Sequence, residues 1–180
     1  MQAKRVVLIA VFASLTAIGA FLRIPLGFSS VSLQVFFTIM AGVILGAKDG
    51  FLSQLVYVLV GLVGFPVFTM GGGITYIFQP SFGFLVGLLP MAYVIGLICA
   101  KGADFARIIL AAVLGLIVLY LIGLPYMYLI ANLYLGKALS VNYVIIYGML
   151  IYLPGDFLKI ITAAVICPKI AKRLRYEKQA

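Results

Sequence analysis

The chain has 180 residues, of which 66% are hydrophobic and only 9% are charged, and its mean hydropathy is +1.27. Soluble domains typically have about a quarter of their residues charged, so this composition excludes an ordinary soluble domain. The apolar runs also lack the alternating pattern of membrane-barrel strands. The sequence therefore predicts an all-α integral membrane protein whose helices form a bundle.

Six apolar runs predict a six-transmembrane-helix bundle within one membrane domain, residues 1–180. The runs cover residues 6–22, 33–47, 51–65, 82–100, 107–131 and 143–167. The second and third runs, at about 15 residues each, reach only about 22 Å, which is less than the roughly 30 Å of a bilayer core. These two runs are either short spans or the arms of a shallow hairpin.

The first run also has the features of a cleavable signal peptide, because a basic start precedes an apolar centre and a small-residue end. Cleavage would leave an odd number of spans and would move the basic C-terminal tail to the other side of the membrane. We therefore interpret this run as the first membrane helix.

The positive residues predict the orientation. With an even number of spans both termini share one side, and that side holds ten of the 13 Lys and Arg residues. They are Lys4, Arg5, Lys48, Lys101, Arg107, Lys169, Lys172, Arg173, Arg175 and Lys178. The opposite side holds Arg23 and Lys137. This asymmetry predicts cytoplasmic termini. It also explains the net charge of +9 by the topology and by contact with anionic lipid headgroups. A nucleic-acid partner for the basic tail is not favoured.

On this topology the outward connections are residues 23–32, 66–81 and 132–142, and they are long and rich in Gly and Pro. Such loops suit a lid over an outward-facing pocket, although the same composition fits plain connectors.

The residue types argue against an enzyme. The chain has no His and only four acidic residues, so the commonest general base and metal ligand is absent. Cys99 and Cys167 have no metal-binding spacing, and we predict no metal site and no cofactor. The "GGG" at 71–73 lacks the lysine of a phosphate-binding loop. Any ATP hydrolysis would therefore take place in another chain.

Two charges stand inside the last apolar run, in "LPGDFLKII" at 153–161. Each charge at the centre of a membrane helix costs about 2.5–3.5 kcal/mol. Asp156 and Lys159 are three residues apart, which places them on one helix face within ion-pairing distance. If Pro168 ends the helix, Asp156 lies about 18 Å from the inner boundary, slightly outward of the midplane. The pair is either an internal ion pair that joins helices or a polar anchor for a ligand.

Other polar residues favour the ligand interpretation. Gln34 begins the second helix at its outer end, and Gln79 lies just before the fourth helix, close to Tyr76. Together with Tyr152 and Asp156 they predict a substrate site that combines three segments of the chain. We also predict an aromatic lining, formed by Phe36, Phe37, Phe78, Phe82, Tyr152 and Phe157.

The first helix carries a face of small residues, Ala10, Ala13, Ala17, Gly19 and Ala20. Ala13 and Ala17 form a small-xxx-small pair, which lets a second helix approach closely in lipid. This face serves either a partner protein or packing within the bundle.

Four segments together resemble the BioY family, the biotin-binding membrane subunits of energy-coupling-factor (ECF) vitamin transporters. In order they are "SLQVFFTIMAGVILGAKDGFLSQLVYVLVGLVGFPVF", "GGG", "QPSFGFLVG" and "LPGDFLK". The resemblance implies a six-helix subunit that binds biotin in an outward pocket. It also implies a partner module of one transmembrane coupling protein and two cytoplasmic ATPases, which docks on Ala13 and Ala17.

The resemblance also assigns roles to residues. Asp156 and Lys159 match the acid and the lysine that follow Pro-Gly in the family and hold biotin, and Gln79 matches a polar amide. The first loop, "FSSVSLQ", departs from the family pattern because Ser32 replaces a threonine and the usual prolines are missing.

Biotin chemistry suits the pair independently. The ureido group has two N–H donors and one carbonyl acceptor, which a carboxylate and an ammonium can satisfy together. Lys159 could instead hold the valerate carboxylate. Two other functions remain open on the sequence alone: a subunit of the same class for another vitamin, or an ion-coupled transporter that uses Asp156 as its proton or sodium site.

Overall fold

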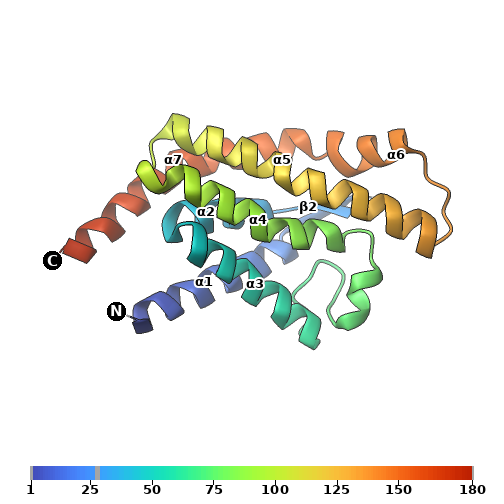
Figure 1. Cartoon of the computed structure of the whole chain (residues 1–180), viewed down its shortest axis with the longest axis horizontal. Coiled ribbons are helices and arrows are strands. Elements are labelled where there is room, and N and C mark those ends of the chain that lie inside the picture. The colour runs from blue at the N-terminus through green and yellow to red at the C-terminus, as the bar shows by residue number, and fades with distance from the viewer. Residues whose placement is uncertain (1, 27–28, 180) are drawn as a thin grey trace.

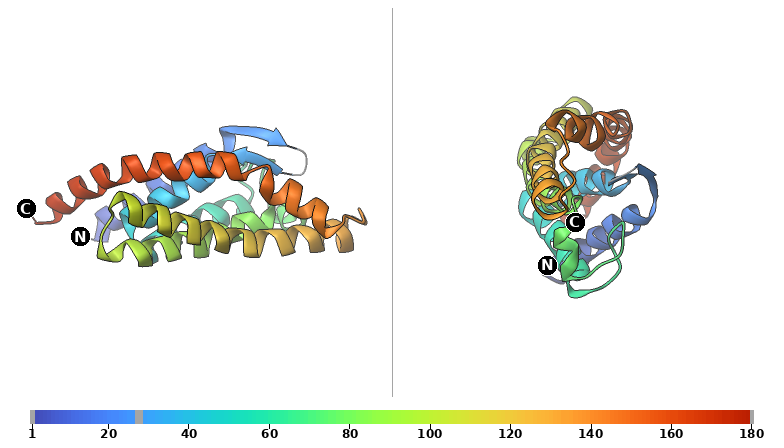
Figure 2. Two further views of the ribbon diagram at one scale, coloured as in Figure 1. Left: turned by 90° about the horizontal axis from the view of Figure 1, so that it is seen from above. Right: turned by 90° about the vertical axis from the view of Figure 1, so that its right-hand side faces the viewer.

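The computed structural model of the chain describes residues 2–26 and 29–179, with side chains for 3–23 and 32–172. The molecule is an elongated bundle of helices, and both termini lie at the same end of it (Figures 1 and 2). The predicted all-α membrane-type fold is confirmed. Within the described residues, 4 helical stretches are long and apolar enough to cross a membrane: Ala3–Phe21, Phe82–Lys101, Phe105–Tyr134 and Val141–Lys172.

The first helix, α1 (Gln2–Phe21), leads into a feature that the sequence did not predict. Strands β1 (Arg23–Leu26) and β2 (Ser29–Ser32) pair antiparallel, with Arg23 opposite Ser32. This hairpin lies along one side of the bundle, in the half away from the termini (Figure 2). Phe28 of the first loop lies outside the described residues.

Helices α2 (Gln34–Leu45) and α3 (Ala47–Val63) are separated by one residue, Gly46. Its φ of +85° is a left-handed conformation that glycine adopts without strain. The 12 residues of α2 extend about 18 Å, which agrees with the expectation of short helices here. Lys48 and Asp49, predicted as part of the connection, instead lie in the first turn of α3.

The chain continues through the short helix η1 (Ile74–Phe78) to α4 (Phe82–Ile98), η2 (Cys99–Lys101) and α5 (Phe105–Leu129), which the π-helix η3 (Ile130–Tyr134) extends. Glycines let α4 and α5 pack closely: Gly87 lies against Leu119, and Gly123 lies against the ring of Phe84. Close backbone approach at small residues is the usual means of helix association in lipid.

The last run is an interrupted helix. It consists of α6 (Val141–Ile145), the π-helix η4 (Ile146–Leu150), a turn at 151–152 and α7 (Leu153–Gln179). The prediction that Pro168 ends this helix is wrong, because α7 continues past it. A proline in a helix removes one backbone hydrogen bond, and the flanking turns can carry that loss in a membrane protein. The side chains of the basic tail after residue 172 lie outside the described part of the chain.

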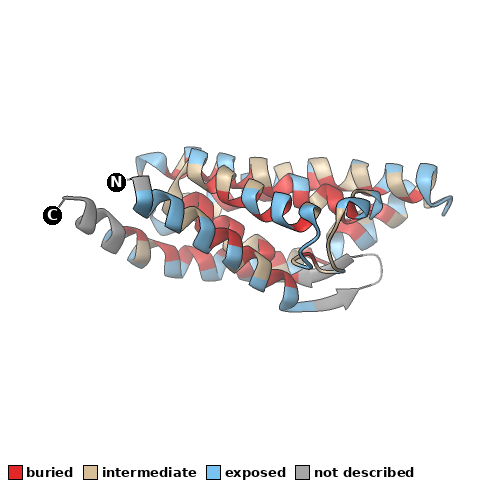
Figure 3. Ribbon diagram, turned by 90° about the horizontal axis from the view of Figure 1, so that it is seen from below, coloured by how far each residue is buried: buried red, intermediate tan, exposed pale blue. Residues whose placement is uncertain are grey.

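A buried polar network joins the first three helices. Gln54 of α3 donates to Thr16 Oγ1 of α1 over 3.3 Å and to Ser53 Oγ over 3.1 Å, and Thr38 of α2 donates to Gln54 Oε1 over 3.1 Å. All four side chains have 0% exposure, and Figure 3 shows the continuous buried zone along the bundle. Every buried polar side-chain atom in the described part has a hydrogen-bond partner, as an apolar solvent requires.

The small-residue face of α1 packs mainly within this bundle. Ala13 is only 6% exposed and belongs to the core, and Ala17 is half-buried against the same core. The side of α1 that faces away from the bundle carries Ala10 and Ser14, which are exposed. α1 packs against α2 and α3, and Ala13 belongs to the buried core. The assignment of Ala13 and Ala17 to partner docking stays a prediction.

We predict that Gly96→Ala destabilises the fold. A Cβ at this position would overlap the backbone of Gly46 and Ala47, where α4 crosses the turn between α2 and α3. Overpacking typically costs about 1–3 kcal/mol, and backbone neighbours cannot move aside as side chains can. The thermal midpoint of purified protein in detergent should fall clearly. Leu97→Ala, on the exposed side of α4, is the control and should change the midpoint little. Equal midpoints for Gly96→Ala and the wild type would contradict this packing.

Candidate functional site

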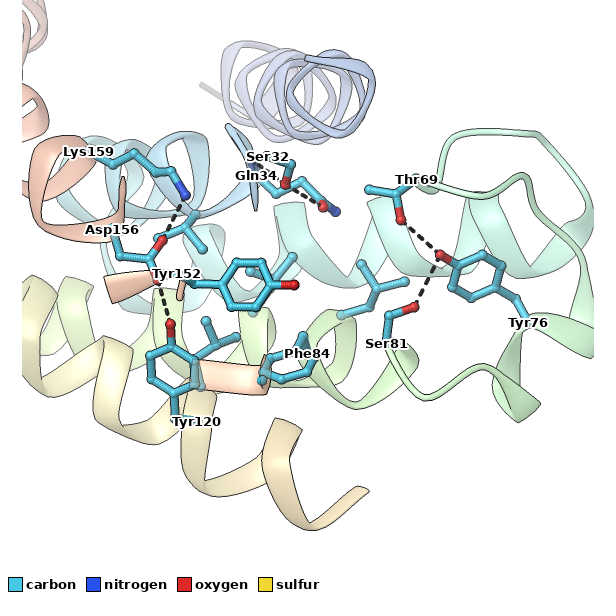
Figure 4. Close-up of a pocket in the computed structure, with 15 residues that line it drawn as sticks. Ser32, Gln34, Thr69, Tyr76, Ser81, Phe84, Tyr120, Tyr152, Asp156 and Lys159 are labelled. Carbon is cyan, nitrogen blue, oxygen red and sulfur yellow. Dashed lines mark hydrogen bonds and ion pairs between the residues drawn. The ribbon is translucent and has the colours of Figure 1, made fainter. Parts of the chain in front are cut away.

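A cavity of about 70 Å³ lies inside the bundle beside strand β2, in the half away from the termini (Figure 2). It is enclosed by β2, α2, α4, α5, η4, α7 and the segment 69–81 (Figure 4). Its lining consists of Ser32, Gln34, Val35, Thr69, Tyr76, Ser81, Phe84, Leu85, Leu88, Leu119, Tyr120, Gly148, Tyr152, Asp156 and Lys159.

The predicted charge pair lies in the wall of this cavity. Lys159 Nζ is 2.7 Å from Asp156 Oδ1, and the Tyr120 hydroxyl donates to Asp156 Oδ2 over 2.6 Å. Asp156 is 3% exposed and Lys159 is 8% exposed. Both carboxylate oxygens are thus engaged, while the ammonium has two further N–H donors beyond the one directed at Asp156.

The local sequence explains where the carboxylate lies. Pro154 is in the first turn of α7, where its missing N–H removes a donor that would have no helical partner. Asp156 follows in the same turn, and its backbone N–H donates to the Tyr152 carbonyl over 2.9 Å. The N-terminal end of a helix favours negative charge. The helix therefore stabilises the same carboxylate that the ion pair neutralises.

Gln34 lines the neighbouring part of the wall, as predicted. Its Oε1 accepts from Ser32 Oγ over 2.8 Å, and its Nε2 donates to the Tyr57 hydroxyl over 2.8 Å. Tyr57 in turn donates to the Val67 carbonyl over 3.1 Å. This chain of hydrogen bonds fixes the amide between the hairpin and α3.

A second polar group lies at the other end of the cavity. The Tyr76 hydroxyl is 3.0 Å from Thr69 Oγ1 and 3.5 Å from Ser81 Oγ. Figure 4 shows this hydroxyl group and the Asp156–Lys159 pair at opposite ends, with the Tyr152 ring between them. The predicted residues Gln34, Tyr76 and Tyr152 are thus brought together with the charge pair.

Gln79 does not join them. It is exposed, follows η1 and is absent from the cavity lining. Tyr76 of η1 is buried whereas Gln79, the residue that caps η1, is exposed, so their closeness in the sequence does not carry over to the cavity. Its assignment to the ligand, which rests on the family resemblance, stays a prediction.

Most of the predicted aromatic lining also lies elsewhere. Of the six rings only Tyr152 lines the cavity. Phe78 stacks on Tyr134 with ring centroids 4.6 Å apart, Phe82 packs in the core, and Phe157 is 50% exposed. Phe36 and Phe37 are half-buried and pack against each other.

Among the lining residues, sequence reasoning assigned to the site only Gln34, Tyr76, Tyr152, Asp156 and Lys159. Thr69, Phe84 and Tyr120 are among those that it missed. Tyr120 carried a usable signal, because a hydroxyl in the middle of the 25-residue apolar helix α5 requires a buried partner. Phe84 carried no such signal because it is one of many apolar residues in its helix, and Thr69 carried none because a hydroxyl in a loop can be satisfied by water.

The chemistry of the cavity suits binding. Asp156 is the single carboxylate in the lining, and the other polar groups are hydroxyls, one amide and one ammonium. No group of three potential metal ligands occurs among the described residues. Leu85, Leu88 and Leu119 supply apolar walls between the polar ends. Such a pocket recognises a small compound that has polar groups at both ends and an apolar body.

Comparisons with known proteins agree with this description. The model of the BioY family matches residues 1–176. A probable biotin transporter BioY of Lysinibacillus sphaericus is 42% identical over 94% of this chain and 87% of its own length. A biotin transporter BioY of Thermotoga maritima is 35% identical over 93% of this chain and 95% of its own.

A solved structure has the same fold. The crystal structure of the S-component for biotin from an ECF-type ABC transporter superposes with a TM-score of 0.82 and 26% identity, covering 95% of this chain and 92% of that chain. These relatives are transport proteins and not enzymes. The chain belongs to the BioY family.

Proposed function

We propose that the protein is the biotin-binding subunit of an ECF-type importer. The observation that carries the proposal is the buried Asp156–Lys159 pair with its Tyr120 contact, which lies in the wall of a cavity in a chain from the BioY family. A purely structural ion pair would have no need of a cavity beside it.

The proposed binding mode follows from donors and acceptors. Asp156 accepts from the ureido N–H groups while Lys159 donates to the ureido carbonyl. The apolar bicycle lies against the leucine walls, and the valerate extends toward the hydroxyls of Thr69, Tyr76 and Ser81. Without ligand the two charges neutralise each other, and with ligand they are redirected to it.

The proposed topology has six crossings, made by α1, α2, α3, α4, α5 and the interrupted helix α6–α7. The shared end of both termini and the ten basic residues on that side support a cytoplasmic location for it in a bacterial plasma membrane. The cavity then lies in the outward half, where external biotin reaches it.

We further propose that transport uses partner subunits, one transmembrane coupling protein and two cytoplasmic ATPases. The absence of a nucleotide-binding motif from the sequence supports separate ATPases. We assign the docking of the coupling protein to the exposed face of α1, which carries Ala10 and Ser14. The half-buried Ala17 lies at the edge of this face. Exposed small residues four apart allow close approach of a partner helix.

The direct test is calorimetry on purified protein. Biotin should bind in 1:1 stoichiometry without ATP and without any sodium or proton gradient, because all the groups of the site lie in this chain. Thiamine, riboflavin and lipoate should not compete. Binding of one of these instead of biotin would assign the site to another vitamin, and a strict sodium or proton requirement would favour an ion-coupled transporter that uses Asp156.

The charge pair gives a sharper prediction. Asp156→Asn and Lys159→Met each leave one uncompensated buried charge, which typically costs about 3–5 kcal/mol, and each should abolish biotin binding. The double variant removes both charges, so it should regain stability yet still fail to bind. Biotin binding by the stable double variant would reduce the pair to a structural role. If Lys159→Met lowers the affinity for biotin and the affinity for its carboxamide by the same factor, the lysine contacts the ureido group and not the valerate.

The docking surface is tested by two sets of variants. Ala10→Leu with Ser14→Leu adds bulk on the exposed face, so the protein should bind biotin normally but fail to co-purify with the coupling protein. Ala13→Leu is the contrast, because it overpacks the core at a typical cost of about 1–3 kcal/mol and should lower the thermal midpoint. Intact complex formation by the Ala10/Ser14 variant would place the docking surface elsewhere.

A further inference from the structure

Besides the ligand cavity, a groove lies on the outer surface of the bundle, at the end that holds both termini. Its volume is about 440 Å³, and residues of α1, α3 and α4 line it: Arg5, Lys48, Phe51, Leu52, Pro90 and Tyr93. Figure 1 shows that the starts of α1 and α3 and the final turns of α4 reach this end. The groove is separate from the ligand cavity, with which it shares no residue.

The groove is apolar along its length and cationic at its mouth. Phe51 and Tyr93 meet edge to face with ring centroids 6.4 Å apart, and Leu52 and Pro90 continue the apolar surface toward the membrane interior. Arg5 and Lys48 are the first residues at the mouth. The candidate span of α1 begins at Ala3, and from this start we infer that the mouth lies near the boundary between hydrocarbon and headgroups.

The charges at the mouth leave a net positive site. Arg5 pairs with Asp49 through Nε and Nη2, with Nη2 2.6 Å from Oδ1. That pairing leaves the two N–H donors of Nη1 outside the ion pair. Lys48 is exposed and has no ion-pair partner among the described residues. Lys48 also lies in the first turn of α3, where the helix terminus itself favours an anion.

We propose that this groove binds an anionic phospholipid of the leaflet next to the termini. The lipid phosphate lies between Arg5 Nη1 and Lys48, and one acyl chain occupies the groove along Phe51, Leu52 and Tyr93. Charge complementarity at the mouth and an apolar groove at membrane depth together select a lipid over a free anion, because a free phosphate would leave the apolar part unused. The site holds a structural lipid at the junction of three helices.

The test uses the fact that the chain has no tryptophan. Leu52→Trp introduces one reporter in the groove, and the protein is reconstituted in phosphatidylcholine vesicles with either dibrominated phosphatidylglycerol or dibrominated phosphatidylcholine. Quenching should show a preference for phosphatidylglycerol of about fivefold, as expected for one net positive charge near a membrane surface. Raising the salt concentration should reduce this preference.

A matched control exists in the chain. Leu121 of α5 is 68% exposed and lines another apolar groove, of about 600 Å³, whose lining residues are all uncharged. A reporter from Leu121→Trp should show equal quenching by the two brominated lipids. Lys48→Gln in the Leu52→Trp background should abolish the preference, whereas Lys101→Gln, an exposed cation outside the groove, should leave it unchanged.

Three outcomes would overturn the proposal. They are equal quenching by both lipids at Leu52→Trp, a preference that survives Lys48→Gln, and displacement of the brominated lipid by inorganic phosphate beyond the effect of chloride at equal ionic strength. The last outcome would assign the mouth to a free anion. Biotin binding by each variant verifies that the fold is intact, since none of these residues lines the ligand cavity.

Discussion

The structure depends on the cost of charge in a solvent of low dielectric constant. Asp156 and Lys159 lie 2.7 Å apart inside the bundle, and the Tyr120 hydroxyl donates to the second carboxylate oxygen of Asp156. Removing either partner would leave the other as an unpaired buried charge. The interruption at η4 and the turn at 151–152 allow a new helix to begin at this depth. Because the last helix is broken, the Asp156 carboxylate lies at the N-terminal end of α7 although its surroundings are apolar.

The same constraint connects the cavity to the rest of the bundle. Gln34 contributes to the cavity wall and bonds to Tyr57 of α3, and one turn further along the same two helices Thr38 bonds to Gln54, which reaches Thr16 of α1. Polar groups in lipid must find partners within the protein, so these residues form a rigid polar frame through α1, α2 and α3.

The two ends of the bundle differ in chemistry. The end away from the termini holds an ion pair, hydroxyls and an amide around a cavity, which suits a small ligand. The end with the termini exposes a cationic mouth on an apolar groove, which suits the headgroup and chain of a lipid. The cavity end thus suits a small solute, and the groove end suits the anionic lipid that we propose.

The sequence by itself determined the solvent, the helical class and the short second and third helices, because hydropathy and length respond directly to the bilayer. It also determined the Asp156–Lys159 pair, since a spacing of three fixes two side chains on one face of any helix. Only the tertiary structure decided which residues face each other across helices. The rotation of α1 buries Ala13 and exposes Ala10, the direction of η1 leaves Gln79 outside the cavity, and the packing of α5 on α7 brings Tyr120 to Asp156. These outcomes depend on the relative rotation of packed helices, which small-residue contacts set jointly across the bundle and which no single segment encodes.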